Sequence, residues 1–403
     1  MFRGESRTMS RIRKALLAIS GGHFLVEGYA AFLPPLVPVF RTRLGFSLGA
    51  AAALAASLPI VSGLVQTIFG LVSDRMRHAN ALVVTSSILA AVSLALLPFA
   101  RSFGWLLLIF TTIALSLAMF HPQGAIGMSQ LSSTNKGRFM SVFNFGGSMG
   151  SFVGSLAIIP LFGLLHLERF WILAIPGIAL ALFQVFALPR QEDPTIAAQN
   201  GNGGRMTDSP AFKGYLMLVA NSTLNAMVYN GVTILLPLLF QGLGFQAGKA
   251  GVYLAVGSLV GAVANVVGAE LSDHIGRRTV NLIGATGVAV TLLMFVLTGS
   301  TSIIWFPAMC FFSCMTLSSN IVFAHELVTN HRGFVSASIM GFSWGIGGVV
   351  VIILGQWAQH TSITSAYHLL LGVAAVLLVL AFLLPTRHAL RAVLEHIPAQ
   401  EQA

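Results

Sequence analysis

The chain has 403 residues, of which 56% are hydrophobic and only 8% are charged. A soluble globular domain carries about 25% charged residues, so this composition excludes a water-soluble protein. The net charge of +10 comes from short basic segments between apolar runs. No soluble domain is long enough to carry the basic face that nucleic-acid binding requires. We therefore expect an integral membrane protein with no nucleic-acid partner.

Apolar segments long enough to cross a bilayer recur along the whole sequence. A membrane-spanning helix needs ~20 predominantly apolar residues. The sequence predicts twelve spans, at residues 14–40, 46–71, 80–100, 104–131, 138–165, 169–188, 212–242, 246–272, 279–298, 303–329, 333–359 and 363–385. Period-two alternation with regular short turns is absent, which disfavours a β-barrel. The expected class is an all-α membrane protein.

The distribution of lysine and arginine predicts the orientation in the membrane. With a cytoplasmic N-terminus, all but five of the 22 Lys and Arg residues fall on the cytoplasmic side. The five others are Arg41, Arg43, Arg101, Arg169 and Lys249. Both termini are therefore expected in the cytoplasm. The basic N-terminus leads into an apolar run without an evident cleavage site, so we expect the first span here rather than a signal peptide.

The longest polar stretch, PRQEDPTIAAQNGNGGRMTDSP, separates six spans from six spans. Its Gly, Pro, Asn and charged residues are typical of a linker. We expect a cytoplasmic tail at 1–13, a six-helix bundle at 14–188, a cytoplasmic linker at 189–211, a second six-helix bundle at 212–385 and a cytoplasmic tail at 386–403.

Short blocks of the first half recur in the second half. Leu44-Gly45-Phe46 returns as Leu243-Gly244-Phe245, and Ser73-Asp74 returns as Ser272-Asp273. Two six-span halves of the same orientation form a parallel pseudo-repeat about an axis along the membrane normal. Such a repeat places a substrate site between the halves near the midplane, and it predicts alternating access by rocking of one half against the other.

The loop GLVSDRMRHAN after the second span and its counterpart AELSDHIGRR share a signature. Its residues are Gly70, Asp74 and Arg75 in the first half and Asp273, Gly276 and Arg277 in the second. With this signature and the six-plus-six repeat, the chain resembles the major facilitator superfamily. The resemblance implies the major facilitator fold, a transporter rather than an enzyme, and a cytoplasmic gate at these loops. An Asp at a helix end can cap a neighbouring helix and pair with an Arg.

A narrower resemblance rests on the blocks FHPQGAIG and FAHELVTNHRG and on His23 followed by Glu27. These blocks look like those of the fosmidomycin-resistance-type efflux proteins. That resemblance implies efflux of a drug or metabolite by a proton-coupled antiporter in the bacterial inner membrane, with antibiotic resistance as a consequence and a proton gradient in place of a cofactor. Gln123 departs from the acid that the resemblance leads us to expect after the His-Pro pair.

Only three acidic residues, Glu27, Glu270 and Glu326, lie within apolar spans. An ionised carboxylate at bilayer depth is costly unless it is paired or hydrated, so such a residue is a functional candidate by default. His23 lies one helical turn before Glu27 on the same face. We expect both to face a central cavity and one or both to carry a proton. A buried structural pair is the alternative. Glu270 is expected to join the cytoplasmic loop network.

His121 and Pro122 form a polar interruption in the fourth span. Such interruptions are tolerated where they line protein or water. Because histidine titrates near neutral pH, His121 is a candidate proton carrier, and a neutral hydrogen-bonding role is the alternative. His325 and Glu326 have a similar depth in the tenth span and are candidates for the same role. The alternative for Glu326 is a surface pair at the cytoplasmic edge, near Arg332.

The seventh span contains a polar stripe of Asn221, Asn225 and Tyr229, spaced by four. A polar stripe in a membrane helix faces the bundle interior, which here should be the cavity, and uncharged groups suit a polar or amphiphilic solute. The full set of expected cavity residues is Tyr29, Gln66, Gln123, Asn144, Asn221, Asn225, Tyr229, Asn230 and Trp344.

The sequence leaves the direction of transport open. An uptake carrier, whether a uniporter or a proton symporter, would use the same fold. A non-transporting membrane sensor or assembly factor would tolerate a neutral residue at Glu27.

No nucleophile motif, phosphate loop or metal-ligand set stands out, so no enzyme, ATP-driven pump or bound metal is expected. Cys310 and Cys314 are expected to pack in a helix contact. The expected partners are a small-molecule substrate, protons and lipid, and the expected state is a monomer.

Overall fold

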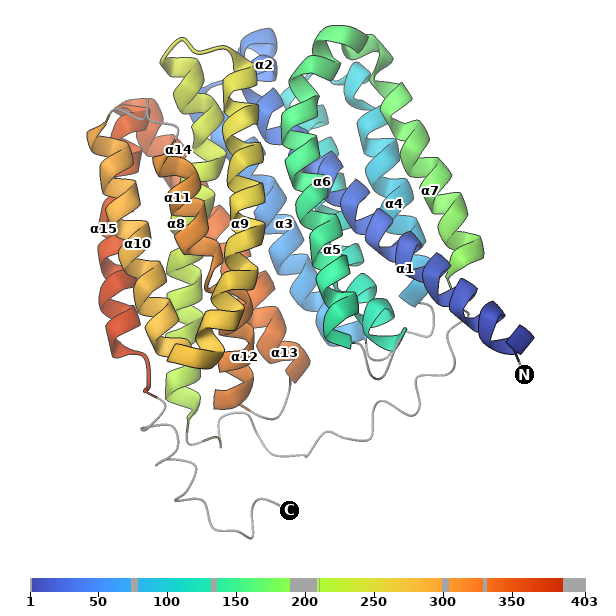
Figure 1. The fold of residues 1–403 in the computed structure, drawn as a ribbon. Helices are drawn as coiled ribbons and strands as arrows, with labels where there is room; N and C mark the ends of the chain where they lie inside the picture. Colours follow the sequence, from blue (N-terminus) through green and yellow to red (C-terminus); the bar gives the residue numbers. More distant parts are fainter. Residues whose placement is uncertain are drawn as a thin grey trace.

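The computed structural model describes residues 2–73, 79–131, 136–188, 209, 211–298, 304–328 and 332–386. Within these ranges the ordered elements are helices, and none is a β-strand (Figure 1). Twelve segments in the described part of the chain are long and apolar enough to cross a membrane. The prediction of an all-α protein with twelve spans is confirmed.

The N-terminal half supplies six spans. They comprise α1 (Phe2–Ala31) with α2 (Leu33–Leu44), then α3 (Leu48–Ser73), α4 (Ala79–Ala95) with the 3-10 turn Leu97–Phe99, α5 (Phe103–Gln130), α6 (Lys136–Leu165), and the 3-10 segment Leu167–Leu173 with α7 (Ala174–Ala187). The break between α1 and α2 follows from Pro34 and Pro35. These prolines lack the N–H groups that would continue the α1 ladder, and they fit the first turn of a new helix.

The C-terminal half repeats this order. It comprises α8 (Phe212–Gly242), α9 (Ala247–Ile275), α10 (Arg277–Leu297), α11 (Trp305–Cys314) with α12 (Leu317–Leu327), α13 (Arg332–Ala337) with the π-helical turn Ser338–Phe342 and α14 (Ser343–His360), and α15 (Ile363–Leu383). Cys310 and Cys314 are buried free thiols of α11 that lie against Gly257 and Gly261 of α9, in the helix contact that the sequence predicts.

Glycines let α1 and α6 approach closely inside the N-terminal half. A Cβ atom added at Gly146 would lie 2.6 Å from the Ser20 carbonyl oxygen, and one at Gly150 would collide with the Phe24 carbonyl. No side chain fits at such positions, so glycine permits direct backbone contact. This close approach sets the distance between the two helices that carry part of the candidate site.

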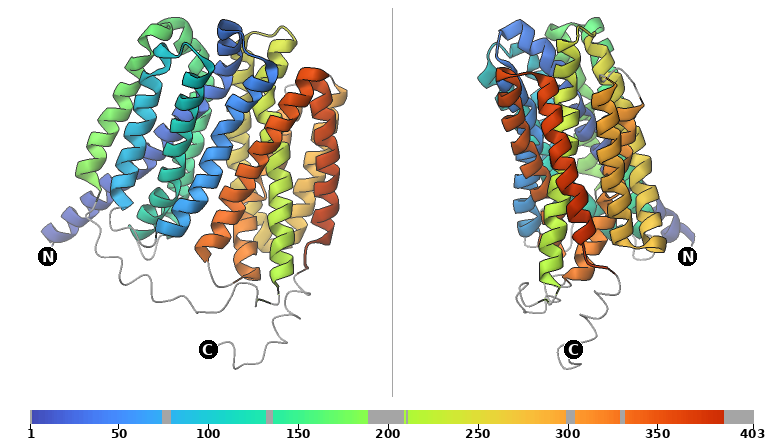
Figure 2. Two further views of the ribbon diagram at one scale, coloured as in Figure 1. Left: turned by 180° about the vertical axis from the view of Figure 1, so that it is seen from behind. Right: turned by 90° about the vertical axis from the view of Figure 1, so that its left-hand side faces the viewer.

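Two helix pairs join the halves along their length. A Cβ at Gly63 of α3 would lie 2.5 Å from the carbonyl oxygen of Gly341, just before α14, and one at Gly251 of α9 would lie 2.6 Å from the Ser155 carbonyl oxygen of α6. The view from behind in Figure 2 shows α3 and α14 side by side. The boundary between the halves is therefore closely packed along α3–α14 and α6–α9.

Hydrogen bonds also join the halves at the end away from the two termini (Figure 1). Arg41 Nη1 donates to Gln241 Oε1 at 2.9 Å, and Gln241 Nε2 donates to the Pro38 carbonyl at 3.1 Å. The Gly49 amide donates to Gln359 Oε1 at 3.0 Å. These contacts hold α2 and the start of α3 against α8 and α14, so this end of the boundary is bridged.

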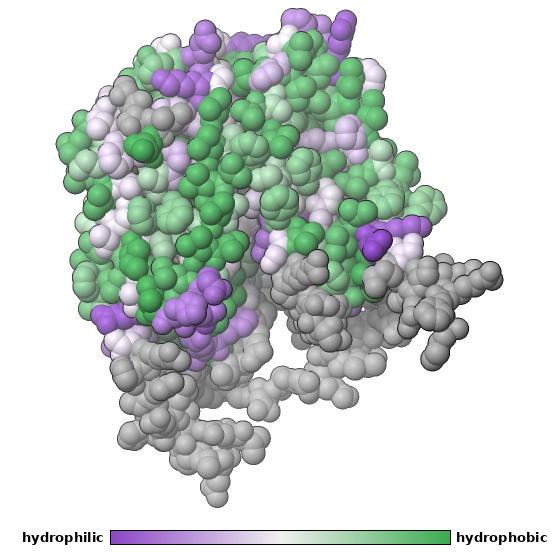
Figure 3. Space-filling view, in the orientation of Figure 1, coloured by the Kyte–Doolittle hydropathy of each residue, from purple (hydrophilic) through white to green (hydrophobic). Residues whose placement is uncertain are grey.

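The outer surface is apolar between the helix ends. Leu164, Phe186 and Val266 are 75%, 85% and 71% exposed, respectively. In Figure 3 hydrophobic residues cover most of the visible face, and hydrophilic ones gather mainly near its upper and lower edges. Exposed apolar surface on this scale requires a hydrocarbon solvent. The protein is an integral membrane protein.

The polar interruption in the fourth span does not break its helix. α5 continues through Pro122, from Phe103 to Gln130. Proline is tolerated inside membrane helices because neighbouring groups can compensate for the missing backbone hydrogen bond. The interruption therefore lies in the side chains, above all His121.

Candidate functional site

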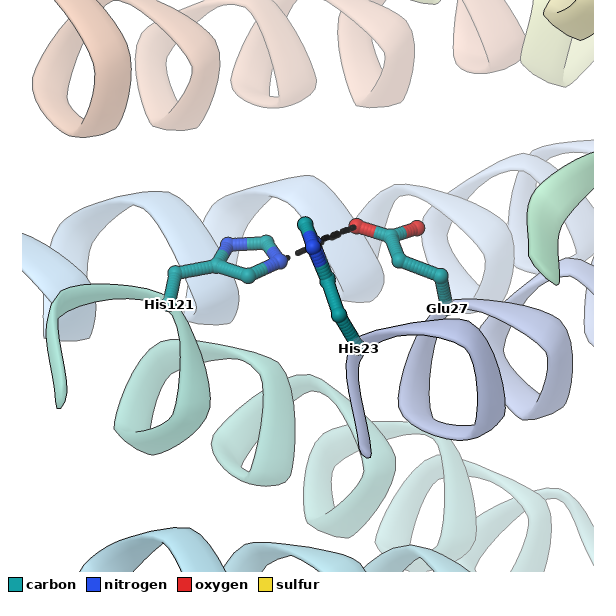
Figure 4. A group of neighbouring side chains, drawn as sticks. All are labelled: His23, Glu27 and His121. Atoms are coloured by element: carbon teal, nitrogen blue, oxygen red, sulfur yellow. Dashed lines mark hydrogen bonds and ion pairs between the residues drawn. The ribbon is translucent and has the colours of Figure 1, made fainter. Parts of the chain in front are cut away.

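Glu27 is the centre of a polar cluster inside the N-terminal half. It lies near the middle of the first span, and its side chain is 25% exposed. Its Oε1 atom lies 3.0 Å from His121 Nε2, and its Oε2 atom accepts a hydrogen bond of 3.0 Å from Ser151 Oγ. Residues of α1, α5 and α6 thus meet at one carboxylate. Figure 4 shows His23 and His121 approaching it from α1 and α5.

His23 is held in one orientation by its surroundings. Its Nδ1 atom lies 2.8 Å from the Phe143 carbonyl oxygen, which can only accept, so Nδ1 carries a proton. The Nε2 atom of the neutral ring then has a free lone pair, and it lies 3.9 Å from Glu27 Oε1. The ring stacks on Phe143 with a centroid distance of 4.0 Å. A Cβ at Gly147 would lie 2.5 Å from the imidazole, so this glycine makes room for the ring.

His121 links Glu27 to the second span. Its Nδ1 atom lies 3.1 Å from Gln66 Oε1, which accepts the Nδ1 proton. The Nε2 atom of a neutral ring is then an acceptor, and it faces a carboxylate oxygen, which is also an acceptor. A hydrogen bond between these two atoms requires one further proton, either on the imidazole or on the carboxyl group. The pair is therefore a place where one proton can be held.

The C-terminal half presents an aromatic pair to this region. Tyr229 of α8 is half-buried and meets Trp344 of α14 edge to face, with ring centroids 5.2 Å apart. Asn230 Nδ2 donates to the Trp344 carbonyl at 3.1 Å. Glu27 is among the groups within electrostatic range of Tyr229, after the nearer thiols of Cys314 and Cys310. The boundary between the halves thus combines a carboxylate and imidazoles with a phenol and an indole.

Tyr29 does not occupy the cavity position that the sequence led us to expect. It is only 6% exposed, its hydroxyl donates to the Leu173 carbonyl, and its ring lies beside Gly177 of α7. Each helical residue advances about 100° around the axis, so Tyr29 lies about 200° from Glu27 on α1. The tyrosine therefore stabilises the α1–α7 contact on the opposite side of the helix.

The polar stripe of the seventh span also serves mainly in helix contacts. Asn225 and Ser313 exchange hydrogen bonds of 3.1 and 3.0 Å between α8 and α11, and both are buried. Asn221 is 2% exposed. Of the three stripe residues, only Tyr229 is more than marginally exposed. The expectation of a cavity-facing position is corrected for Asn225, because amide side chains in membranes also join neighbouring helices.

The remaining cavity candidates, Gln66, Gln123 and Asn144, lie in three different surroundings. Gln66 joins the cluster through His121. Gln123 is 2% exposed, and neither of its amide atoms has a hydrogen-bond partner within the described ranges. Asn144 is exposed on α6. No hydrogen bond in the described part of the chain connects Gln123 or Asn144 to Glu27.

Glu326 and His325 lie away from the cluster. Arg277 Nε and Nη2 both lie 3.3 Å from Glu326 Oε1, and the Glu326 side chain is 41% exposed. His325 Nε2 lies 2.8 Å from Ser336 Oγ. Glu326 therefore forms an edge pair of the kind weighed from the sequence, with Arg277 as its partner. The Arg332 side chain lies outside the described residues.

The second copy of the loop signature forms a charged network at one end of the C-terminal half. Arg277 Nη1 lies 2.6 Å from Asp273 Oδ1, and Gly276 turns the chain between α9 and α10 with φ of +93°. Glu270 pairs with His274 at 3.2 Å in the same region. Gly70 lies near the end of α3, and Asp74 and Arg75 lie outside the described residues. The gate role of both copies remains a prediction.

Sequence reasoning missed Ser151 and the Phe143 carbonyl as partners of the cluster. Ser151 stands in the glycine-dense segment NFGGSMGS of α6. That pattern signals a close helix contact, but it does not identify the partner helix. The hydrogen bond to Glu27 follows only once α6 is known to pack on α1.

Comparison with known families matches residues 19–352 to the model of the Major Facilitator Superfamily. The chain is 25% identical over 398 residues to the fosmidomycin resistance protein of Escherichia coli (strain K12), covering 95% of this chain and 96% of the relative. It is 24% identical over 404 residues to the uncharacterized MFS-type transporter YfnC of Bacillus subtilis (strain 168), covering 93% and 94%.

Solved structures show the same fold. A mutant of the nucleoside transporter NupG has a TM-score of 0.75 at 14% identity, covering 92% of this chain and all of that one. A bacterial homolog of the human lysosomal transporter Spinster, in an inward-facing and unoccupied conformation, has a TM-score of 0.74 at 15% identity, covering 96% and 98%. At these identities the likeness concerns the fold alone.

Proposed function

The chain belongs to the major facilitator superfamily and is a membrane transporter, not an enzyme, and from this premise we propose that it exports a small molecule in exchange for protons. The observation that carries the proposal is the contact of 3.0 Å between Glu27 Oε1 and His121 Nε2. This contact requires a shared proton, and it lies within the membrane-spanning part of the chain.

Exchange of solute for proton follows because the two compete for the Glu27 carboxylate. With a proton, the Glu27–His121 pair is neutralised and can persist inside the bilayer. When the site opens to the other side, the proton leaves, and a polar solute can take its place among Glu27, Gln66 and Tyr229. A carrier that binds either proton or solute, and changes conformation only when one is bound, exchanges the two.

The position of the bridged end supports a site that opens toward the cytoplasm. Arg41 and Gln241 join the halves at the end away from the termini. The lysine and arginine distribution supports cytoplasmic termini, and with that orientation the bridged end is external. We place the protein in the bacterial inner membrane. Both halves of the site come from one chain, so a monomer is sufficient for transport.

The printed name of the Escherichia coli relative suggests fosmidomycin as the first solute to test. Cells that lack their own exporters and express this chain should grow at higher fosmidomycin concentrations than cells with an empty vector. In everted membrane vesicles energised by respiration, labelled fosmidomycin should accumulate, and a proton ionophore should abolish the accumulation.

The matched variants are Glu27→Gln and Glu326→Gln, which each replace one carboxylate by an amide. Glu27→Gln should abolish gradient-driven accumulation, whereas Glu326→Gln should retain it. Accumulation that survives the ionophore, or that Glu27→Gln leaves unchanged, would contradict proton coupling through this pair. If fosmidomycin is not accumulated, a resistance screen over other small polar antibiotics identifies the solute for the same two variants.

A further inference from the structure

Three metal-ligating side chains converge at the Glu27 cluster. His23, Glu27 and His121 each offer one ligand atom, and these atoms all lie within 4.8 Å of one another. Around a tetrahedral Zn²⁺ ion with bonds of about 2.0–2.1 Å, neighbouring ligand atoms are about 3.3 Å apart. The distances from Glu27 Oε1 to His121 Nε2 and His23 Nε2, 3.0 and 3.9 Å, lie on either side of this value. The third pair, the ring nitrogens of His23 and His121, lies within the same 4.8 Å.

Each of these ligands is oriented by a partner of its own. Phe143 O accepts from His23 Nδ1, and Gln66 Oε1 accepts from His121 Nδ1, so both Nε2 lone pairs are directed at the carboxylate. Ser151 Oγ occupies Glu27 Oε2 and leaves Oε1 for the cluster. Metal-binding histidines almost always donate the other ring N–H to a carbonyl or carboxylate oxygen, and this fixes the tautomer that binds metal. This pattern of outer hydrogen bonds matches that of known metal sites.

We propose that His23, Glu27 and His121 form a binding site for a divalent transition-metal ion of the Zn²⁺ class. Two imidazoles and one carboxylate suit Zn²⁺ and Co²⁺, whereas Mg²⁺ and Ca²⁺ prefer oxygen ligands throughout. Three protein ligands leave a fourth position open. Glu27 and His121 are 25% and 24% exposed, so these two ligands are accessible to an ion.

The ion takes the place of the proton that the Glu27–His121 contact requires. Metal binding needs a carboxylate and neutral imidazoles, so bound metal and bound proton exclude each other. A bound metal ion should therefore inhibit proton exchange, and a chelator that removes the ion should restore it. The binding itself depends neither on the direction of transport nor on the identity of the solute.

The sequence alone did not predict this site. His23 and Glu27 are one turn apart, but His121 comes from a span 94 residues beyond Glu27. Short metal motifs in a sequence reveal ligands on one element, whereas here the third ligand and all outer partners come from other helices. The expectation of no metal-ligand set therefore reflects the limits of local spacing.

Co²⁺ binding to the full chain tests the proposal directly. Protein without an affinity tag, stripped with a chelator and placed in lipid nanodiscs, is titrated with Co²⁺ and followed by visible absorption. We expect one Co²⁺ per chain with the bands of a four-coordinate site, displaced by Zn²⁺ and not by excess Mg²⁺. His121→Gln and Glu27→Gln should each weaken binding more than about tenfold, and loss of the outer partner in Gln66→Leu should weaken it about 10- to 100-fold.

The matched control is His274→Gln. His274 and Glu270 form an exposed pair at 3.2 Å that offers two ligands but no buried site, so this variant should bind Co²⁺ like the parent. Size-exclusion profiles and metal-free unfolding temperatures show which variants are folded, and His23→Gln replaces any variant that is not. Absence of Co²⁺ binding, or binding that both His121→Gln and Glu27→Gln leave unchanged, would overturn the proposal. The titration uses no gradient and no solute, so its failure is distinct from a failure of proton-coupled export.

Discussion

His121 Nε2 lies 3.0 Å from Glu27 Oε1, and this contact joins α5 to α1 inside the membrane-spanning part of the N-terminal half. Ser151 of α6 adds a second contact at the other carboxylate oxygen. A carboxylate with both oxygens engaged is far less costly in a bilayer than an isolated one. The structure thus explains how Glu27 can remain inside the bilayer. The proposed mechanism depends on the proton that Glu27 and His121 share.

Gly147→Ala should damage the cluster without touching Glu27. The added Cβ would lie 2.5 Å from the His23 imidazole, so the ring must leave the Phe143 carbonyl or the helices must separate. Such overpacking costs about 1–3 kcal/mol of stability. We expect a lower unfolding temperature in detergent and slower transport.

Gly163→Ala on the same helix is the control for that variant. A Cβ at Gly163 would have nothing within 4 Å, and alanine is favoured over glycine in a helix by about 0.5–1 kcal/mol. Gly163→Ala should therefore keep or raise the unfolding temperature. Equal behaviour of the two variants would mean that the space beside His23 is not restrictive.

Asn225 and Ser313 should be coupled in stability rather than in solute recognition. Ser313 Oγ donates to Asn225 Oδ1 between α8 and α11 in a buried contact, and Asn225 Nδ2 also donates to the Ser313 backbone carbonyl, which Ser313→Ala keeps. Measured hydrogen-bond couplings in a membrane protein average about 0.6 kcal/mol and reach about 1.7. A double-mutant cycle of Asn225→Ala and Ser313→Ala, read by unfolding, should give a coupling of this size. Additive effects of the two substitutions would refute the hydrogen bond between Ser313 Oγ and Asn225 Oδ1.

Gln241→Ala should loosen the bridged end of the molecule. It removes the acceptor of Arg41 and the donor to the Pro38 carbonyl, and each hydrogen bond contributes about 0.5–1.5 kcal/mol. Spin labels at the exposed positions Arg101 and His360 report the separation of the halves at this end by pulsed electron paramagnetic resonance.

We expect a larger population of long distances between these labels in Gln241→Ala than in the parent. Gln246→Ala changes an exposed glutamine at the start of α9, in the neighbouring loop, and should leave the distance distribution unaltered. An unchanged distribution in Gln241→Ala as well would show that the bridge does not hold the halves together.

Glu326→Gln should have a small effect that is confined to stability. Glu326 is 41% exposed and pairs with Arg277 at 3.3 Å, and exposed ion pairs contribute about 0.2–1 kcal/mol. The unfolding temperature should fall slightly in low salt, and the difference from the parent should vanish in high salt. Gradient-driven flux should be retained, and its loss would assign a coupling role to Glu326 that its position does not suggest.

The fold could be predicted from the sequence because its signals are local. Twelve apolar runs, a polar linker and repeated blocks such as Leu44-Gly45-Phe46 are each contained in a short segment. The bilayer allows few ways to satisfy the backbone of such segments, so hydropathy determines the class. The pairing of α6 with α1 and of α14 with α3 was not predictable, because glycine patterns mark close contacts without naming partners.

The candidate site was predictable in part for the same reason. Glu27 and His121 stand out as ionisable residues in apolar spans, and the structure brings them together. Tyr29 and Asn225 looked similar in the sequence but stabilise helix contacts. Polarity in a membrane helix shows that a side chain avoids lipid; whether it faces a neighbouring helix or the boundary between the halves depends on angular positions that only the assembled bundle fixes.

Proton movement driven by the solute tests the central claim most directly. Proteoliposomes containing a pH-sensitive dye are given an outward gradient of the exported solute, with the membrane potential clamped. The parent protein should move protons inward, so the lumen should acidify. Glu27→Gln should exchange labelled for unlabelled solute while the lumenal pH stays constant. Solute-driven acidification that persists in Glu27→Gln would contradict the account, because the proton would then travel by another group.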